Sequence, residues 1–248
     1  MLGLPDTVRA CLFDMDGVLT RTATVHAAAW KEMFDDFLRA WSVRTDTPFE
    51  PFTSEDYADY VDGKPRADGT RSFLRSRGIT LPEGPEDGDG DAPGTMTVRG
   101  LGDRKNDLVL RKLADEGVEV YEGSVAYVRA VREAGLRTAV VSSSANTAQV
   151  LEAAGIADLF DVRVDGLVAQ RLGLAGKPAP DMFLAAAEAL GVRPEHAAVF
   201  EDALAGVAAG RAGGFAIVIG VDRDEHREQL LKHGADIVVN DLAELLET

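Results

Sequence analysis

The 248-residue chain has a single cysteine and far fewer basic than acidic side chains. With one cysteine, Cys11, an internal disulfide is excluded, and its place in an apolar run predicts a buried side chain in a reducing compartment. The formal charge of −16 argues against nucleic acid or an anionic membrane as the main partner. A phosphorylated ligand stays open, because a local cation can reverse the field inside one cleft.

Long hydrophobic runs are also missing. No apolar stretch approaches the roughly 20 residues that a helix needs to cross a bilayer. The opening MLGLPDTVRA lacks the charged start and long apolar stretch of a signal peptide. We therefore expect a cytoplasmic protein without membrane contact, folded as one domain plus an insertion.

What the sequence does contain is an alternation of short apolar runs with helical patterns after Tyr121. Examples are LRTAVVS, HAAVFED and FAIVIG, each set between helical stretches. This alternation predicts a parallel sheet covered on both faces, to which VRACLFD adds a first strand. The expected fold is α/β: a doubly wound parallel-sheet, Rossmann-like core formed by residues 1–20 and 121–248. A mostly helical cap, residues 21–120, is inserted after the first strand.

Within the insertion, apolar spacing predicts helices over 23–41, near 54–61 and 66–77, and from the DRKND stretch to Gly117. Residues 79–95, ITLPEGPEDGDGDAPGT, are rich in glycine, proline and acid. Because such a composition cannot bury a core, we expect a mobile loop there.

Polar side chains gather where the predicted strands end, which is the edge at which such sheets bind ligands. They are Asp14 and Asp16 after the first strand, Ser142, Ser143, Ser144 and Asn146 in SSSAN, Lys177 in GKPAPD, and Glu201 and Asp202 in FEDALAG. Each motif alone has an ordinary structural interpretation as a turn, a helix cap or a loop. Four of them in this order favour a chemical site.

Such residues suit phosphoryl transfer. A carboxylate can attack phosphorus, and a second one nearby can move the proton of the leaving or attacking oxygen. Clustered carboxylates repel one another unless a divalent cation lies among them, and Mg²⁺ prefers oxygen ligands. Hydroxyl groups and a lysine can hold the phosphoryl oxygens.

DMDGVLT, VVSSSAN, GKPAPD and FEDALAG resemble the four motifs of the haloacid dehalogenase-like phosphotransferases. That resemblance covers nearly the whole chain and implies that Asp14 is the nucleophile and Asp16 the general acid/base. It also implies a Mg²⁺ site formed by Asp14, Asp16 through its backbone carbonyl, Glu201 and Asp202. The resemblance further implies that phosphate is bound by Gly17, Ser142, Ser143, Ser144, Asn146 and Lys177.

The insertion is similar to that of the β-phosphoglucomutase-like subfamily. The resemblance rests on TATVHAAAWK, VDGKPRADG and DRKND, and it implies that His26, Trp30, Arg66 and Lys105 contact the substrate. By spacing alone, Arg66 could instead form an exposed pair with Asp68, His26 could be half-buried, and Lys105 could be solvated.

The resemblance thus implies a Mg²⁺-dependent phosphomutase that interconverts β-glucose 1-phosphate and glucose 6-phosphate through an aspartyl-phosphate and glucose 1,6-bisphosphate. The expected partner is a small phosphorylated sugar, and the expected assembly is a monomer or weak oligomer. The alternative is a sugar-phosphate phosphatase with water as the acceptor. A non-catalytic sugar-phosphate sensor would not need Asp16, and a nicotinamide-binding protein would carry a G-x-G-x-x-G after its first strand.

Overall fold

The computed structural model describes residues 2–85, 96–223 and 225–246. The chain folds as two compact units. The sheet unit comprises Met1–Thr22, Gly63–Pro65 and Val118–Thr248, and the helical unit comprises Ala23–Asp62 and Arg66–Gly117. The short segment Gly63–Pro65, which the sequence analysis placed within the helical insertion, thus packs with the sheet unit.

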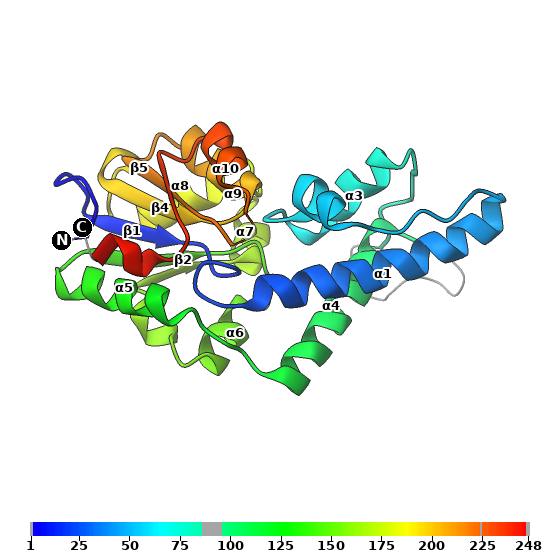
Figure 1. Cartoon of the computed structure of the whole chain (residues 1–248), viewed down its shortest axis with the longest axis horizontal. Helices are drawn as coiled ribbons and strands as arrows, with labels where there is room; N and C mark the ends of the chain where they lie inside the picture. The colour runs from blue at the N-terminus through cyan, green and yellow to red at the C-terminus, as the bar shows by residue number, and fades with distance from the viewer. Residues whose placement is uncertain (1, 86–95, 224, 247–248) are drawn as a thin grey trace. The chain divides into compact units, whose positions relative to one another are not determined.

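The sheet unit is built on six parallel strands in the order β3-β2-β1-β4-β5-β6 (Figure 1). The strands are β1 (Ala10–Phe13), β2 (Arg137–Val141), β3 (Val162–Val164), β4 (Ala197–Glu201), β5 (Ile217–Val221) and β6 (Ile237–Val239). Every residue of β1 and β4 is buried, as expected for central strands covered on both faces. The predicted α/β fold with a doubly wound parallel sheet is confirmed.

Helices cover both faces of this sheet. They are α5 (Glu122–Glu133), α6 (Thr147–Ala153), α7 (Gly166–Leu172), α8 (Asp181–Ala189), α9 (Leu204–Ala212) and α10 (Arg227–His233), with short 3₁₀ segments at Ala157–Leu159, Pro194–His196 and Leu242–Leu246. Among the described residues, no helix has the length and apolar character that a membrane crossing requires.

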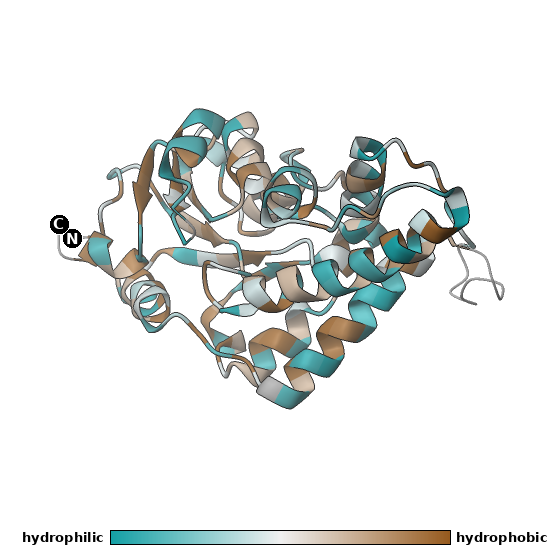
Figure 2. Ribbon diagram, turned by 45° about the vertical axis from the view of Figure 1, so that its right-hand side comes forward, coloured by the Kyte–Doolittle hydropathy of each residue, from teal (hydrophilic) through white to brown (hydrophobic). Residues whose placement is uncertain are grey.

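Alternate residues of β1 point to opposite faces of the sheet. Ala10 and Leu12 join the hydrophobic core to which α8 and α9 contribute. Phe13 faces the other way, where its ring stacks on Phe200 at a centroid distance of 4.4 Å and meets the edge of Tyr127 from α5 at 6.4 Å. The strands carry much of the hydrophobic colour in Figure 2. Two separate apolar layers therefore fix β1, and with it the position of the chain directly after Phe13.

Cys11 is completely buried in β1, which confirms the prediction of a buried side chain. Burial raises the pKa of its thiol above the ordinary value, so the thiolate, the reactive form, is disfavoured.

The helical unit contains α1 (Thr22–Thr45), α2 (Ser54–Asp56), a π-helical turn at Tyr57–Val61, α3 (Arg66–Ser76) and α4 (Val98–Glu116). Its core is aromatic: Phe34 lies against Trp30, Phe52 and Phe73 at ring-centroid distances of 5.2, 5.1 and 4.2 Å. Such ring pairs add to the stabilisation from burial itself, which gives this small unit a core of its own.

Helices α4 and α7 both differ from the sequence prediction, and each begins at a capped residue. Helix α4 begins at Val98, earlier than expected, since the Thr97 hydroxyl accepts a hydrogen bond from the Gly100 N–H at 2.9 Å. Helix α7 was not predicted at all. Its start is capped by Asp165, which accepts from the Val168 N–H at 2.9 Å. Of the loop predicted over 79–95, residues 79–85 are non-helical, and 86–95 lie outside the described residues.

Candidate active site

The strand order places the ends of β1 and β4 side by side at the point where the chain reverses its direction of winding. In doubly wound sheets, ligands bind in the crevice outside the carboxyl ends of the strands at this point. Asp14 follows β1, Glu201 ends β4, and Asp202 comes next. The Asp14 N–H donates to the Phe200 carbonyl at 2.9 Å, which ties the two strand ends together.

Three carboxylates meet there. One oxygen atom from each of Asp14, Glu201 and Asp202 lies within 4.8 Å of the others. Asp14 is 6% exposed and Glu201 is not exposed at all. Buried carboxylates at this spacing repel one another, so the group needs positive charge from within the protein or from a bound cation.

Lys177 supplies part of that charge. Its ammonium group lies 2.5 Å from Asp14 Oδ1, contacts the Glu201 carboxylate, and donates to the Val141 carbonyl at 3.1 Å. The Lys177 side chain is fully buried. One lysine cannot balance three carboxylates, so a net negative charge remains among these four residues.

The pKa values of this group reflect the imbalance. Burial raises the pKa of the Asp14 carboxyl well above its ordinary value, and the Glu201 and Asp16 carboxylates raise it further, against the opposing effect of Lys177. Burial by itself would lower the pKa of Lys177, but the Asp14 and Glu201 carboxylates outweigh burial and the pKa is raised. Lys177 therefore offsets part of the cost of burying the Asp14 carboxylate.

Two glycines make room for the acids. A Cβ atom on Gly17, whose φ is +90°, would lie 1.7 Å from Asp202 Oδ2. A Cβ atom on Gly206 would lie 1.8 Å from Glu201 Oε1. The backbone thus approaches both carboxylates as closely as glycine alone permits. With three buried or half-buried oxygen donors in one cradle and an excess of negative charge, the donor set fits a divalent cation such as Mg²⁺.

Asp16 lies beside the acid cluster with its carboxylate held by hydroxyl groups. The Thr22 hydroxyl donates to Asp16 Oδ1, and the Ser142 hydroxyl donates to Oδ2 at 3.3 Å. Thr22 is buried and in turn contacts the Thr20 hydroxyl at 2.7 Å. These two hydroxyl donors fix the direction of the Asp16 carboxylate.

The SSSAN loop runs from the end of β2 to the start of α6. Ser142 and Ser144 accept hydrogen bonds through their hydroxyl oxygens from the N–H groups of Ser144 and Asn146, both at 3.1 Å. The Ser143 hydroxyl donates to the carbonyl of Gly63 at 2.8 Å. These bonds give the loop a fixed shape beside Asp16.

The predicted substrate residues of the insertion lie in the helical unit. Lys105 is 5% exposed, with Nζ 2.7 Å from His26 Nδ1 and 4.9 Å from the centre of the Trp30 ring. Lys105 is therefore not solvated. Arg66 donates to the Gly102 carbonyl at 3.3 Å and lies 3.6 Å from Asp103, not beside Asp68.

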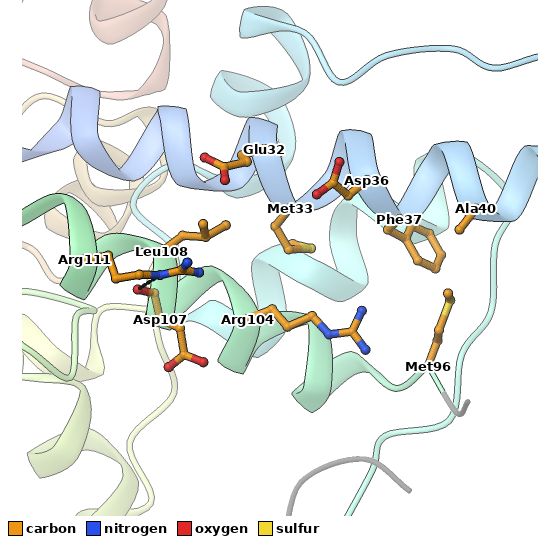
Figure 3. A pocket seen from close by; sticks show the side chains of 10 residues that line it. All are labelled: Glu32, Met33, Asp36, Phe37, Ala40, Met96, Arg104, Asp107, Leu108 and Arg111. Atoms are coloured by element: carbon orange, nitrogen blue, oxygen red, sulfur yellow. Dashed lines mark hydrogen bonds between the residues drawn. The ribbon is translucent and has the colours of Figure 1, made fainter. Parts of the chain in front are cut away.

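A separate cavity of about 300 Å³ lies between α1 and α4 within the helical unit (Figure 3). Its lining includes the buried apolar side chains Met33 and Phe37 and the charged side chains Asp36, Arg104 and Arg111. None of the predicted site residues lines it. This cavity is thus distinct from the residues that the sequence motifs single out.

The structure brings together Asp14, Asp16, Ser142, Lys177, Glu201 and Asp202, which the sequence separates by up to 188 positions. It also adds residues that the motifs did not single out. Thr22 was missed because a threonine at the start of a helix usually acts as a cap. Gly206 stands at the end of FEDALAG, and a glycine near a helix start could have indicated a close approach.

The family model for haloacid dehalogenase-like hydrolases matches residues 8–214. A β-phosphoglucomutase of Mycobacterium bovis is 56% identical over 250 residues, which cover 99% of this chain and 94% of the relative. A β-phosphoglucomutase of Bacillus subtilis is 30% identical over 96% of this chain and 92% of its own length. A crystal structure of CbbY from Rhodobacter sphaeroides in complex with phosphate has a TM-score of 0.68 and 25% identity, with 96% of each chain covered.

A doubly wound sheet with a lysine and several carboxylates at its switch point defines an α/β protein whose ligand site contains buried charged side chains. The family match and the 56% identity show that the chain belongs to the haloacid dehalogenase-like hydrolases. Within this family it is an enzyme of the β-phosphoglucomutase-like type. The same identity supports a phosphomutase within this family.

Proposed function

We propose that the protein interconverts β-glucose 1-phosphate and glucose 6-phosphate through glucose 1,6-bisphosphate, with Asp14 as the phosphoryl carrier. The observation that carries the proposal is the buried Asp14 carboxylate, paired with Lys177 and followed two residues later by an Asp16 held by hydroxyl donors. Relatives that are named β-phosphoglucomutase over nearly the full length support the choice of substrate.

In the proposed reaction an Asp14 oxygen attacks phosphorus and the bond from phosphorus to the leaving oxygen breaks. Asp16 protonates a leaving sugar oxygen and takes the proton back when a sugar hydroxyl attacks the aspartyl-phosphate. Lys177 keeps Asp14 in place and balances charge, and the SSSAN loop with Gly17 binds phosphoryl oxygens. Asp14, the Asp16 carbonyl, Glu201 and Asp202 would hold Mg²⁺, which when bound offsets the charge of the acids and the phosphate.

The helical unit is proposed to act as the cap that selects the substrate. His26, Trp30 and Lys105 form one cluster in which a buried cation and an imidazole lie together. Arg66 has a guanidinium group that can bind a phosphate bidentately. We infer that these residues contact the sugar and the phosphate that is not being transferred.

Phosphorus NMR tests the proposal directly. The protein is given β-glucose 1-phosphate, Mg²⁺ and a trace of glucose 1,6-bisphosphate, and glucose 6-phosphate and free phosphate are followed. Glucose 6-phosphate without free phosphate is the expected result. Free phosphate as the main product would instead support the second candidate, a sugar-phosphate phosphatase, which the hydrolase description of the family keeps open. Binding without either product would indicate a sensor.

Arg66→Ala is expected to lower the mutase kcat/KM about 100-fold while changing the hydrolysis of an aryl phosphate less than about 3-fold. The reason is that only the bisphosphate needs a second anion site, and a lost charge-assisted contact costs about 1.5–3 kcal/mol. Arg71→Ala is the matched control on the same helix, since Arg71 is engaged by Glu83 and Asp68. Equal losses with both substrates would remove the role assigned to Arg66.

Mg²⁺ is expected to raise the melting temperature of the wild-type protein. Binding to the folded state alone stabilises it by about 2.7 kcal/mol at 100 times the dissociation constant. Asp202→Asn should abolish most of this shift, whereas Asp158→Asn, at an exposed position of the sheet unit, should keep it. Thermal unfolding with and without Mg²⁺ measures both, and an unchanged wild-type midpoint at millimolar Mg²⁺ would contradict the metal site.

A further inference from the structure

Arg223 follows β5 at the edge of the sheet where the acids lie, yet it belongs to none of the four motifs. Its side chain is 14% exposed. The guanidinium Nε donates to the backbone carbonyl of Gly17 at 2.9 Å. Gly17 is the residue directly after Asp16, so a cation from a distant part of the chain contacts the backbone of the catalytic loop.

The position of Gly17 has little freedom. Its N–H donates to the Thr20 carbonyl at 2.8 Å, and its Cα hydrogens face Asp202 so closely that no side chain fits. A shift of the Gly17 carbonyl would therefore displace the adjoining Asp16, or it would change the close approach between Gly17 and Asp202. Holding that carbonyl is a way of holding both acids.

Arg223 is itself fixed from several directions. Its guanidinium stacks on the Tyr121 ring, 3.5 Å from the ring centre. One terminal nitrogen donates to the Asn240 carbonyl at 2.6 Å and lies 3.3 Å from Asp241 Oδ2, and the other donates to the Ser124 hydroxyl at 3.4 Å. The flat, forked guanidinium group can make these contacts together with the one to Gly17, whereas an ammonium group cannot.

Tyr121, the stacking partner of Arg223, also contacts this loop. The Tyr121 N–H donates to the carbonyl of Leu19 at 2.9 Å, two residues beyond Gly17. The guanidinium group of Arg21 also lies over the Tyr121 ring, at 4.5 Å from its centre. Arg223 and Tyr121 thus form one assembly that contacts the loop at Gly17, Leu19 and Arg21.

We propose that Arg223 is a positioning residue for phosphoryl transfer, holding the Gly17 carbonyl so that Asp16 keeps its reactive placement and Asp202 its close contact with Gly17. The inference rests on the proposed function in one respect, that Asp14 carries the phosphoryl group. Arg223 touches neither acid directly. Its effect is therefore on the rate of the chemical step rather than on the affinity for substrate.

Steady-state hydrolysis of an aryl phosphate with saturating Mg²⁺ tests this in wild type, Arg223→Lys and Arg223→Met. We expect kcat to fall about 10-fold in Arg223→Lys and about 100-fold in Arg223→Met, with KM within about 2-fold, because misplacement of reacting groups by about 1 Å costs rate on that scale. Asp241→Asn is the matched control: it weakens the ion pair with Arg223 but leaves the contact with Gly17. Its kcat should stay within about 3-fold of wild type even if its melting temperature falls.

Unchanged kcat in the folded Arg223 variants, a KM increase in place of the kcat loss, or an equal kcat loss in Asp241→Asn would each overturn the inference. If Arg223→Met is unfolded at the assay temperature by near-UV circular dichroism, Arg223→Lys, which keeps the charge, decides the matter alone. A wild-type protein without any phosphoryl transfer would overturn the proposed function, and with it this inference.

Discussion

Asp14→Asn is expected to lower the rate of phosphoryl transfer by about 10⁴-fold or more, the scale seen when an attacking group is removed. The amide has nearly the shape of the carboxylate, but it carries no charge and its oxygen is a poor nucleophile. Asp14 is the buried acid that Lys177 contacts at the end of β1. Among the acids of the cluster, Asp14 is the one that directly follows β1 and has a second aspartate, Asp16, two positions later.

Both activities should be lost together in this variant. Phosphorus NMR with β-glucose 1-phosphate and a continuous assay with an aryl phosphate provide the two measurements. The fold should persist, because the substitution removes one of three mutually repelling carboxylates and leaves the contact between Lys177 and Glu201. Asp158→Asn serves as the control for a substituted surface aspartate. Residual turnover within 10-fold of wild type would exclude Asp14 as the phosphoryl carrier.

Lys177→Met is expected to destabilise the metal-free protein by about 3–5 kcal/mol, the range found when one partner of a buried ion pair is removed. Methionine fills a similar volume beside Phe183, which lies 5.0 Å from the ammonium group. The loss is therefore mainly electrostatic. It leaves the Asp14 and Glu201 carboxylates buried without the cation that contacts both of them.

Urea denaturation of wild type and variant, each with and without Mg²⁺, measures this effect. Mg²⁺ should restore part of the stability of Lys177→Met, since it offsets the same negative charges. Lys232→Met, at an exposed position of α10, should change the unfolding free energy by no more than about 0.5 kcal/mol. A loss of less than about 1 kcal/mol in the metal-free Lys177 variant would show that this lysine does not balance the acids.

Most of the sheet unit could be predicted because its elements are local. VRACLFD, LRTAVVS and HAAVFED each carry apolar runs bounded by polar residues, and each became a strand buried on both faces. Helix α7 was harder to see. Its one buried residue is Ala169, so the segment shows almost no apolar periodicity. The residues that indicate a helix there are the capping residue Asp165 before it and Gly173 after it.

The clustering of the candidate site residues could be predicted for a related reason. Asp14, Lys177 and Glu201 stand at strand ends or just before a helix, and strand ends of a parallel sheet meet at one edge. Their pairing and their spacing could not be predicted, because both depend on how β1 and β4 are aligned. In the register of these two strands, Phe13 lies opposite Phe200. The stacking of the two rings on one face of the sheet supports this register.

The sequence by itself determined the fold class, the order of the motifs and the types of chemical group at each strand end, because apolar periodicity and strand-end position are local properties. The tertiary structure alone decided that Thr22 donates to Asp16, that Gly17 and Gly206 make way for two carboxylates, and that Arg223 holds the Gly17 carbonyl. Those contacts join residues up to 206 positions apart. Only the packing of the sheet with its helices brings such residues within hydrogen-bonding distance.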